Sequence, residues 1–162
     1  MRSTHRPARF RSLLVAALTL LGLLSAGVST AGDGKVYSPL GCAPQYPSQA
    51  QYLYPYGAGI RNISSSNLYL SCPIVKDHIG GTKLNYMSVT YLSPEVSGFT
   101  CNFFASSPYG NAATSRYLYG SRSTSYRTIS STDLPAYSGG ELYLSCKMPP
   151  GSTFKAYRVD ED

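Results

Sequence analysis

The sequence predicts an all-β protein: a single antiparallel β-sandwich, jelly-roll or immunoglobulin-like, with about seven or eight strands and two disulfides. Short segments with alternating apolar and polar residues are separated by turn signals at intervals of about 8 to 12 residues. The pentapeptide Leu-Tyr-Leu-Ser-Cys occurs twice, at 68–72 and 142–146. The four cysteines follow an N-terminal segment that is typical of secreted proteins, in which an even cysteine count indicates disulfides.

The N-terminal segment, residues 1–31, has the three parts of a secretory signal peptide. Four arginines precede the apolar run Leu13–Leu24, and Ser29-Thr30-Ala31 places small residues where signal peptidase cuts. We therefore expect cleavage after Ala31 and a secreted or periplasmic protein. The apolar run is shorter than the roughly 20 residues of a membrane span, so we expect no transmembrane segment in the mature chain.

The mature sequence is long enough for one domain. Residues 32–56 are rich in Pro, Gln, Ser and Tyr without a sustained period, and they are predicted to form an extended N-terminal segment held by Cys42. Residues 57–162 are predicted to form the sandwich. Four of the 14 basic residues lie before Gly32, so ten remain against eight acids, a net charge of +2. This small charge gives no support to a nucleic-acid partner.

About eight segments of the mature sequence have the alternation or the composition of short strands. In chain order they are 60–63, 68–72, 85–91, 99–103, 117–119, 125–129, 141–146 and 154–159. Turns or breaks separate them, such as the Gly-Gly turn at 77–81 and Pro149-Pro150-Gly151. Because only a short loop containing Pro94 and Gly98 joins 85–91 to 99–103, these two segments are predicted to form an antiparallel hairpin.

The repeated pentapeptide predicts two similar strands. In both copies the leucines and the cysteine fall on alternate positions and face inward, so Tyr69 and Tyr143 face outward. The copies begin 74 residues apart. The chain is therefore either a pseudo-duplicated pair of half-sandwiches or a single sandwich with two similar disulfide strands, and the sequence leaves both interpretations open.

The cysteines permit three pairings. We favour Cys42 with Cys72 and Cys101 with Cys146, because the first ties the N-terminal segment to the sheet and the second joins two inward-facing strand positions. In the rival pairing, Cys72 bonds to Cys146. No two cysteines are closer than 29 residues, so a zinc half-site and a redox CxxC motif are both excluded.

The cysteine strands also carry a resemblance. A signal peptide followed by strands that end in Ser-Cys-Pro, at 71–73, and in Ser-Cys-Lys-Met-Pro-Pro-Gly-Ser, at 145–152, resembles small secreted or periplasmic bacterial β-sandwich proteins with paired disulfides. The motifs lie around Cys72, Cys101 and Cys146, and the resemblance covers most of the mature chain. It implies an extracytoplasmic sandwich and brings no catalytic residues.

Residues suited to catalysis are sparse. His78 is the only histidine after the signal, and its neighbour Asp77 points elsewhere if this stretch is a turn. A carboxylate pair for glycoside hydrolysis would have to come from Asp77, Glu95, Asp133, Glu141 or the C-terminal acids. Nucleophile-elbow, zincin, phosphate-loop and EF-hand motifs are missing. We therefore expect no enzymatic activity, no cofactor and no metal.

Tyrosines and arginines are the better candidates for function. A tyrosine offers a flat apolar face and a hydroxyl, which suits stacking on a sugar ring or packing in an interface. Between Val96 and Thr132 the sequence has no acid, and arginines interleave with tyrosines. The possible ligand-binding residues are Tyr69, Tyr143, Tyr117, Tyr119, Arg116, Arg122 and Arg127. The competing interpretation is that these tyrosines only cover strands and that the arginines are ordinary solvated positions.

The sequence thus predicts a secreted, non-catalytic binding or envelope-associated protein. One alternative is a carbohydrate-binding module that uses exposed tyrosines, with the arginine-containing stretch holding an anionic polysaccharide. The other is a structural or protein-interaction component of the cell surface that acts through an exposed edge strand. The expected partners are accordingly a polysaccharide or a surface protein, not a nucleic acid.

Overall fold

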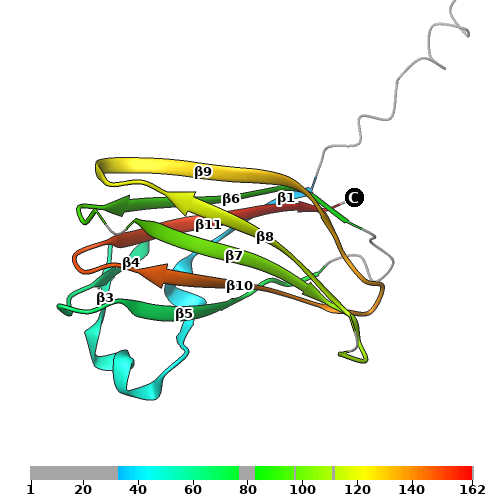
Figure 1. Ribbon diagram of the computed structural model, residues 1–162, viewed down its shortest axis with the longest axis horizontal. Helices are drawn as coiled ribbons and strands as arrows, with labels where there is room; N and C mark the ends of the chain where they lie inside the picture. The colour runs from blue at the N-terminus through cyan, green and yellow to red at the C-terminus, as the bar shows by residue number, and fades with distance from the viewer. Residues whose placement is uncertain (1–32, 77–82, 97, 111, 162) are drawn as a thin grey trace, which may run out of the picture. The chain divides into compact units, whose positions relative to one another are not determined.

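The computed structural model describes residues 33–76, 83–96, 98–110 and 112–161. The predicted signal peptide and the candidate residues Asp77 and His78 lie outside the described residues. The described chain contains eleven strands and two short 3-10 helices (Figure 1). In order they are β1 (Asp33–Tyr37), η1 (Pro39–Gly41), β2 (Ala43–Pro44), η2 (Pro47–Tyr52), β3 (Leu53–Tyr56), β4 (Gly59–Asn62), β5 (Leu68–Pro73), β6 (Lys83–Ser93), β7 (Phe99–Ser106), β8 (Ala113–Gly120), β9 (Ser123–Pro135), β10 (Glu141–Met148) and β11 (Thr153–Glu161).

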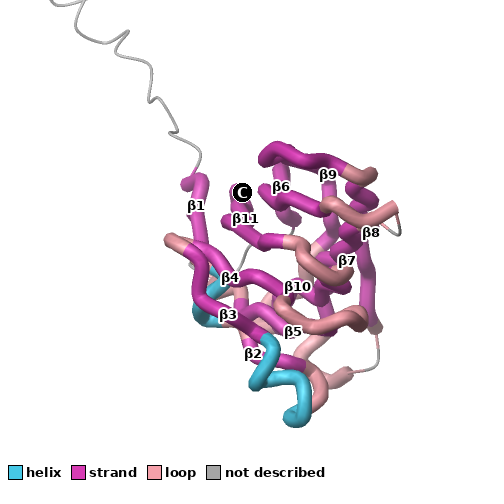
Figure 2. The backbone as a smooth tube through the Cα atoms, turned by 90° about the vertical axis from the view of Figure 1, so that its left-hand side faces the viewer, coloured by secondary structure: helices cyan, strands magenta, loops and turns pink. Residues whose placement is uncertain are grey.

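The strands form two antiparallel sheets in two layers, so the predicted β-sandwich is confirmed (Figure 2). The first sheet has the order β3-β4-β11-β6-β9, and β1 also pairs with β11. The second sheet has the order β2-β5-β10-β7-β8. The two 3-10 helices, drawn in cyan in Figure 2, lie near β2 and β3.

The N-terminal segment, residues 32–56, contributes more regular structure than its sequence indicates. It supplies β1, β2 and β3, which add to the eight strands expected from alternation. β2 has two residues, and β3 is an edge strand that contains Pro55. Each of the three pairs with a single neighbour, so little of their sequence needs the apolar alternation of a central strand.

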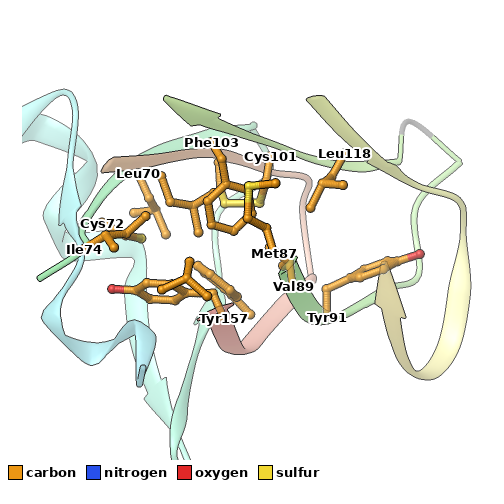
Figure 3. Packing of buried hydrophobic residues seen from close by; sticks show 14 of the residues in the cluster. Leu70, Cys72, Ile74, Met87, Val89, Tyr91, Cys101, Phe103, Leu118 and Tyr157 are labelled. Carbon is orange, nitrogen blue, oxygen red and sulfur yellow. A yellow bond between two sulfur atoms is a disulfide. The ribbon is translucent and has the colours of Figure 1, made fainter. Parts of the chain in front are cut away.

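The inward faces of the two sheets form one hydrophobic core. In Figure 3 the labelled side chains of Leu70 and Phe103, from the second sheet, face those of Val89 and Tyr157 from the first. The hydroxyl of Tyr157 is the polar tip of this core, and it donates a hydrogen bond of 2.7 Å to the carbonyl of Pro73 in the opposite sheet. Burial, together with the neighbouring Tyr37, raises the pKa of Tyr157 to about 12. The hydroxyl therefore stays protonated and keeps its bond across the physiological pH range.

The predicted hairpin of 85–91 with 99–103 is wrong. These segments belong to β6 and β7, which lie in different sheets: β6 pairs with β11 and β9, whereas β7 pairs with β10 and β8. The connecting loop crosses between the layers, and Gly98 in this loop has a φ of 69°, a conformation that favours glycine. The alternating apolar residues of the two strands therefore meet across the core instead of side by side.

The disulfides join Cys42 to Cys72 and Cys101 to Cys146, the pairing that the sequence favours. Cys101 and Cys146 are register partners on β7 and β10. The two copies of the pentapeptide, in β5 and β10, are antiparallel neighbours in one sheet, with Ser71 opposite Ser145. The copies are thus related by a local two-fold arrangement within the second sheet.

Candidate functional site

The outward face of the second sheet carries both repeat tyrosines. β5 and β10 pair directly but run in opposite directions, so Tyr69 lies opposite Lys147 and Tyr143 lies opposite Pro73. Tyr69 and Tyr143 are therefore four residues apart along β10, or about 13 Å. The two rings lie toward opposite ends of this face and do not form a single platform.

Each repeat tyrosine is paired with a second aromatic ring. Tyr69 meets Tyr46 edge-on, with ring centroids 6.1 Å apart, and Tyr143 stacks on Phe104 at 4.8 Å. Sequence reasoning missed both partners. Phe104 was detectable, because it occupies an outward position next to the inward-facing Phe103 of the same strand.

A shallow hollow of about 330 Å³ lies between the two aromatic pairs. Tyr69, Phe104 and Tyr117 supply aromatic surface to its lining, and polar groups come from Asn102 and Ser145, which are opposite each other on β7 and β10. Thr100 and Lys147 also line it. The hollow therefore combines flat apolar faces with hydrogen-bonding groups on central strands of the sheet.

The hydrogen bonding of these polar groups is uneven. The hydroxyl of Ser145 accepts a hydrogen bond of 2.8 Å from the side-chain amide of Gln45. The amide of Asn102 makes no side-chain hydrogen bond with another described residue, and its Oδ1 is buried without a partner. Leaving a polar atom in this state costs about 1–3 kcal/mol. Asn102 therefore carries a buried amide oxygen whose hydrogen-bonding capacity is not used by the described part of the protein.

A second hollow, of about 410 Å³, lies where the edge strands β8 and β9 approach each other. Its lining includes Tyr119 from the end of β8, Arg122 from the following turn and Arg127 from β9. Tyr91 also lines it, and the Tyr91 hydroxyl donates a hydrogen bond of 2.9 Å to the carbonyl of Ser121 in the turn. Two of the three candidate arginines are thus brought together.

Arg116, the third candidate arginine, lines neither of these hollows. Its Nη2 donates a hydrogen bond of 2.8 Å to the carbonyl of Asp133 on β9. Thr114 donates a hydrogen bond of 2.7 Å to the carbonyl of Pro135 on the same strand. These two side chains of β8 therefore bind carbonyl groups of the neighbouring edge strand, which would otherwise face solvent.

A larger hollow, of about 480 Å³, lies between η2 and the loop 63–67. Much of its polar lining is bonded within the protein: the Gln49 side chain donates to the carbonyl of Asn67 and accepts from the backbone of Tyr69. Among the described residues that line it, only Tyr52 is aromatic. This hollow therefore offers a poorer stacking surface than the hollow on the second sheet.

The acidic candidates within the described residues do not line any of these hollows. Glu95, Asp133 and Glu141 are exposed and lie on different elements. None of them lines the hollows described above. Among the described residues, no three His, Cys, Asp or Glu side chains gather in a way that would hold a metal ion. The same part of the chain has no helix long and apolar enough to span a membrane.

No protein-family model matches this sequence, and a comparison with curated proteins finds no significant match. Solved structures with a similar fold do exist. The C-terminal carbohydrate-binding module CBM6 of a marine laminarinase from Zobellia galactanivorans aligns with a TM-score of 0.50 and 12% identity, covering 79% of this chain and 99% of that one. A CBM6 of Clostridium stercorarium, solved with cellobiose, has a TM-score of 0.44, 13% identity and coverage of 82% and 89%.

The similar structures also include a protein of another kind. The tryptic core of a Bacillus thuringiensis Cry1Da variant has a TM-score of 0.44 and 12% identity, and the match covers 74% of this chain and 23% of that one. At identities this low, a structural match identifies the fold alone. The protein therefore shares the β-sandwich fold of the laminarinase CBM6.

Proposed function

We propose that the protein is a secreted or periplasmic, non-catalytic carbohydrate-binding module that holds a polysaccharide on the outward face of its second sheet. The observation that carries this proposal is the hollow between two aromatic pairs, with the unused amide of Asn102 in its lining. Aromatic faces stack on the apolar faces of sugar rings, while amide, hydroxyl and ammonium groups bond the sugar hydroxyls.

The dimensions of the face suit an extended chain. Tyr69 and Tyr143 lie about 13 Å apart along the strands, with Asn102 and Ser145 between them. A chain of several sugar units would therefore contact both aromatic pairs and the polar groups at the same time. Because these residues lie on paired strands, the face is preorganised and little ordering entropy is lost on binding.

Two further observations support a binding role over catalysis. No described Asp or Glu, the residues that glycoside hydrolysis requires, lines any of the three hollows described above. The fold is also that of the laminarinase CBM6, although the 12% identity transfers no binding residue. The proposal therefore depends on the residues of the face itself.

The first prediction concerns the two repeat tyrosines. Tyr69→Ala combined with Tyr143→Ala is expected to weaken polysaccharide binding roughly 30-fold or more, because each stacked ring contributes on the order of 1 kcal/mol or more. The secreted protein would be incubated with a panel of insoluble and immobilised cell-wall and capsular polysaccharides. The bound fraction would then be measured as a function of polysaccharide concentration.

The matched control for this prediction is Tyr54→Ala combined with Tyr56→Ala. It also removes two exposed tyrosines, but from edge strand β3 of the first sheet. We expect its binding to equal that of the wild type. If the control lost binding and the Tyr69/Tyr143 variant kept it, the proposed face would be wrong and an interface at β3 would be favoured. Failure of the wild type to bind any polysaccharide would also refute the proposal.

The second prediction separates binding from stability at Asn102. Asn102→Ala is expected to weaken binding about tenfold, because the face loses the polar amide group that this residue contributes to the lining of the hollow. The melting temperature is expected to stay the same or to rise, since the substitution removes a buried oxygen that has no partner and breaks no hydrogen bond with a described residue. Titration with the polysaccharide and thermal unfolding of the same sample would measure both quantities.

Asn62 provides the control for this second prediction. Its side-chain amide is fully buried, donates to the carbonyls of Ser66 and Met148 and accepts from the backbone of Ser64. Asn62→Ala should therefore lower the melting temperature clearly. Wild-type affinity in Asn102→Ala, or a melting temperature as low as that of Asn62→Ala, would count against a ligand-binding role for Asn102.

A further inference from the structure

The two hollows border the same edge strand. Tyr117 lines the first hollow and Tyr119 lines the second, and both face outward from β8. They are two residues apart, or about 7 Å. Both rings are largely exposed, at 63% for Tyr117 and 57% for Tyr119. An aromatic surface therefore leads from the proposed glycan-binding face to the hollow that contains Arg122 and Arg127.

The basic residues of the protein divide into two groups. Seven of the ten that follow residue 32 have a partner. Lys35, Lys83 and Arg158 pair with carboxylates, Lys76 and Arg116 donate to backbone carbonyls, and Arg61 and Lys155 lie over tyrosine rings. The other three, Arg122, Arg127 and Lys147, have no ion pair, side-chain hydrogen bond or ring contact with a described residue. Arg122 and Arg127 line the second hollow, and Lys147 lines the first.

The same surface lacks negative charge. Neither hollow is lined by Asp or Glu, and the chain has no acid between Val96 and Thr132, a stretch that includes β7, β8 and part of β9. Glu95, just before this stretch, is exposed and forms no ion pair with a described residue. The positive charge of the three unpartnered cations is therefore not compensated locally, and it attracts anionic ligands.

The chemistry of these groups indicates which anions would bind. A guanidinium presents a planar fork of N–H donors that matches the two oxygens of a carboxylate or a sulfate, whereas an ammonium acts as a point charge. Arg122 and Arg127 line one hollow, so they can hold one such group from two sides. Lys147, in the other hollow, can meet a second anionic group farther along the same chain.

We propose that the ligand is an anionic polysaccharide whose carboxylate or sulfate groups bind Arg122 and Arg127, while its chain continues along Tyr119 and Tyr117 into the first hollow toward Lys147. This inference rests on the proposed glycan-binding function, and it specifies the chemical class of the glycan. It also gives the second hollow a role: this hollow selects for charge, whereas the aromatic pairs bind the sugar rings.

The test compares matched pairs of charged and uncharged polymers. One pair is polygalacturonate and its carboxyl-reduced form, and the other is dextran sulfate and dextran. Dissociation constants for the secreted protein would be measured at low and at high salt. We expect at least one acidic polymer to bind about tenfold or more tightly than its uncharged counterpart, and we expect this advantage to shrink at high salt. The pair with the larger advantage identifies carboxylate or sulfate as the recognised group.

The variant Arg122→Gln with Arg127→Gln tests whether the second hollow is responsible for the charge selectivity. It is expected to bind the preferred acidic polymer about tenfold more weakly and the uncharged polymers as the wild type does. Arg61→Gln with Arg158→Gln removes the same net charge from two residues of the first sheet that line neither hollow, and should leave every affinity unchanged.

The possible results separate the two proposals. Equal affinity for charged and uncharged polymers, with binding still lost in the Tyr69/Tyr143 variant, would overturn the charge selectivity and leave the glycan-binding face in place. Equal losses in the two arginine variants would also overturn it, because net charge alone would then explain binding. A Tyr69/Tyr143 variant that binds every polymer like the wild type, or a wild type that binds none of them, would overturn both proposals.

Discussion

Removal of the disulfide between Cys101 and Cys146, by changing both residues to alanine, is expected to lower the free energy of unfolding by about 4 kcal/mol. The bond closes a loop of 45 residues, so its loss gives the unfolded chain more conformational freedom. Both sulfurs are also buried in the core, and their removal leaves unfilled space. Because a small domain has a net stability of roughly 5–15 kcal/mol, this single bond accounts for a large share of it.

Urea unfolding of the wild type and of the variant would measure this difference, and the melting temperature should fall by about 10 °C or more. Cys42→Ala with Cys72→Ala is the comparison, since that bond closes a shorter loop of 30 residues and Cys42 is only partly buried. We expect a somewhat smaller loss for it. A Cys101/Cys146 variant whose melting temperature stayed within about 2 °C of the wild type would contradict the prediction.

This disulfide also bears on the proposed site. Cys101 and Cys146 face the core. Their strand neighbours Asn102 and Ser145 face the hollow on the other side of the sheet. The bond therefore fixes the register of the two strands that supply the central polar groups. A slip of one residue would turn Asn102 inward and remove it from the hollow. Stability and the proposed binding geometry thus depend on the same pair of strands.

Much of the sandwich was predictable because the alternation of apolar residues is a local property of a strand. The segments 68–72 and 141–146 were expected to turn their leucines and cysteine inward, and β5 and β10 have this pattern of burial. Strand pairing is not local in the same sense. Alternation in 85–91 and 99–103 indicated which side chains face inward but not which sheet holds them, and for this reason the expected hairpin failed.

The candidate site was predictable only residue by residue. An outward position on a strand can be read from its neighbours, and Tyr69 and Tyr143 do face outward. Their separation follows from the antiparallel register of β5 and β10, which no local pattern encodes. The three arginines looked equivalent in the sequence, but Arg116 donates to a backbone carbonyl while Arg122 and Arg127 share a hollow. Their difference arises from the long-range contact of β8 with β9.

The other large effect is expected in the core, at Phe154 of β11. Its side chain has 0% exposure and lies between two aromatic rings, with centroid distances of 5.6 Å to Phe99 of the opposite sheet and 5.8 Å to Tyr157 of its own strand. Phe99 in turn stacks on Tyr91, so four rings form a row in which the contact of Phe154 with Phe99 joins the two sheets. Loss of such a ring removes buried apolar area and leaves a cavity that a rigid sandwich fills poorly.

Phe154→Ala is therefore expected to lower the free energy of unfolding by about 4 kcal/mol, and Phe154→Leu, which keeps most of the volume, by roughly 1.5 kcal/mol. Tyr117→Ala is the matched control: it also removes an aromatic ring from a strand, but from an exposed position, and should change stability by about 0.5 kcal/mol or less. Urea midpoints of the three variants would test this order.

Below its unfolding transition, Phe154→Ala should still bind the polysaccharide, because Phe154 is buried and lies in the sheet opposite the proposed face. A Phe154→Ala midpoint as high as that of Tyr117→Ala would show that the sheets are held together without this aromatic contact.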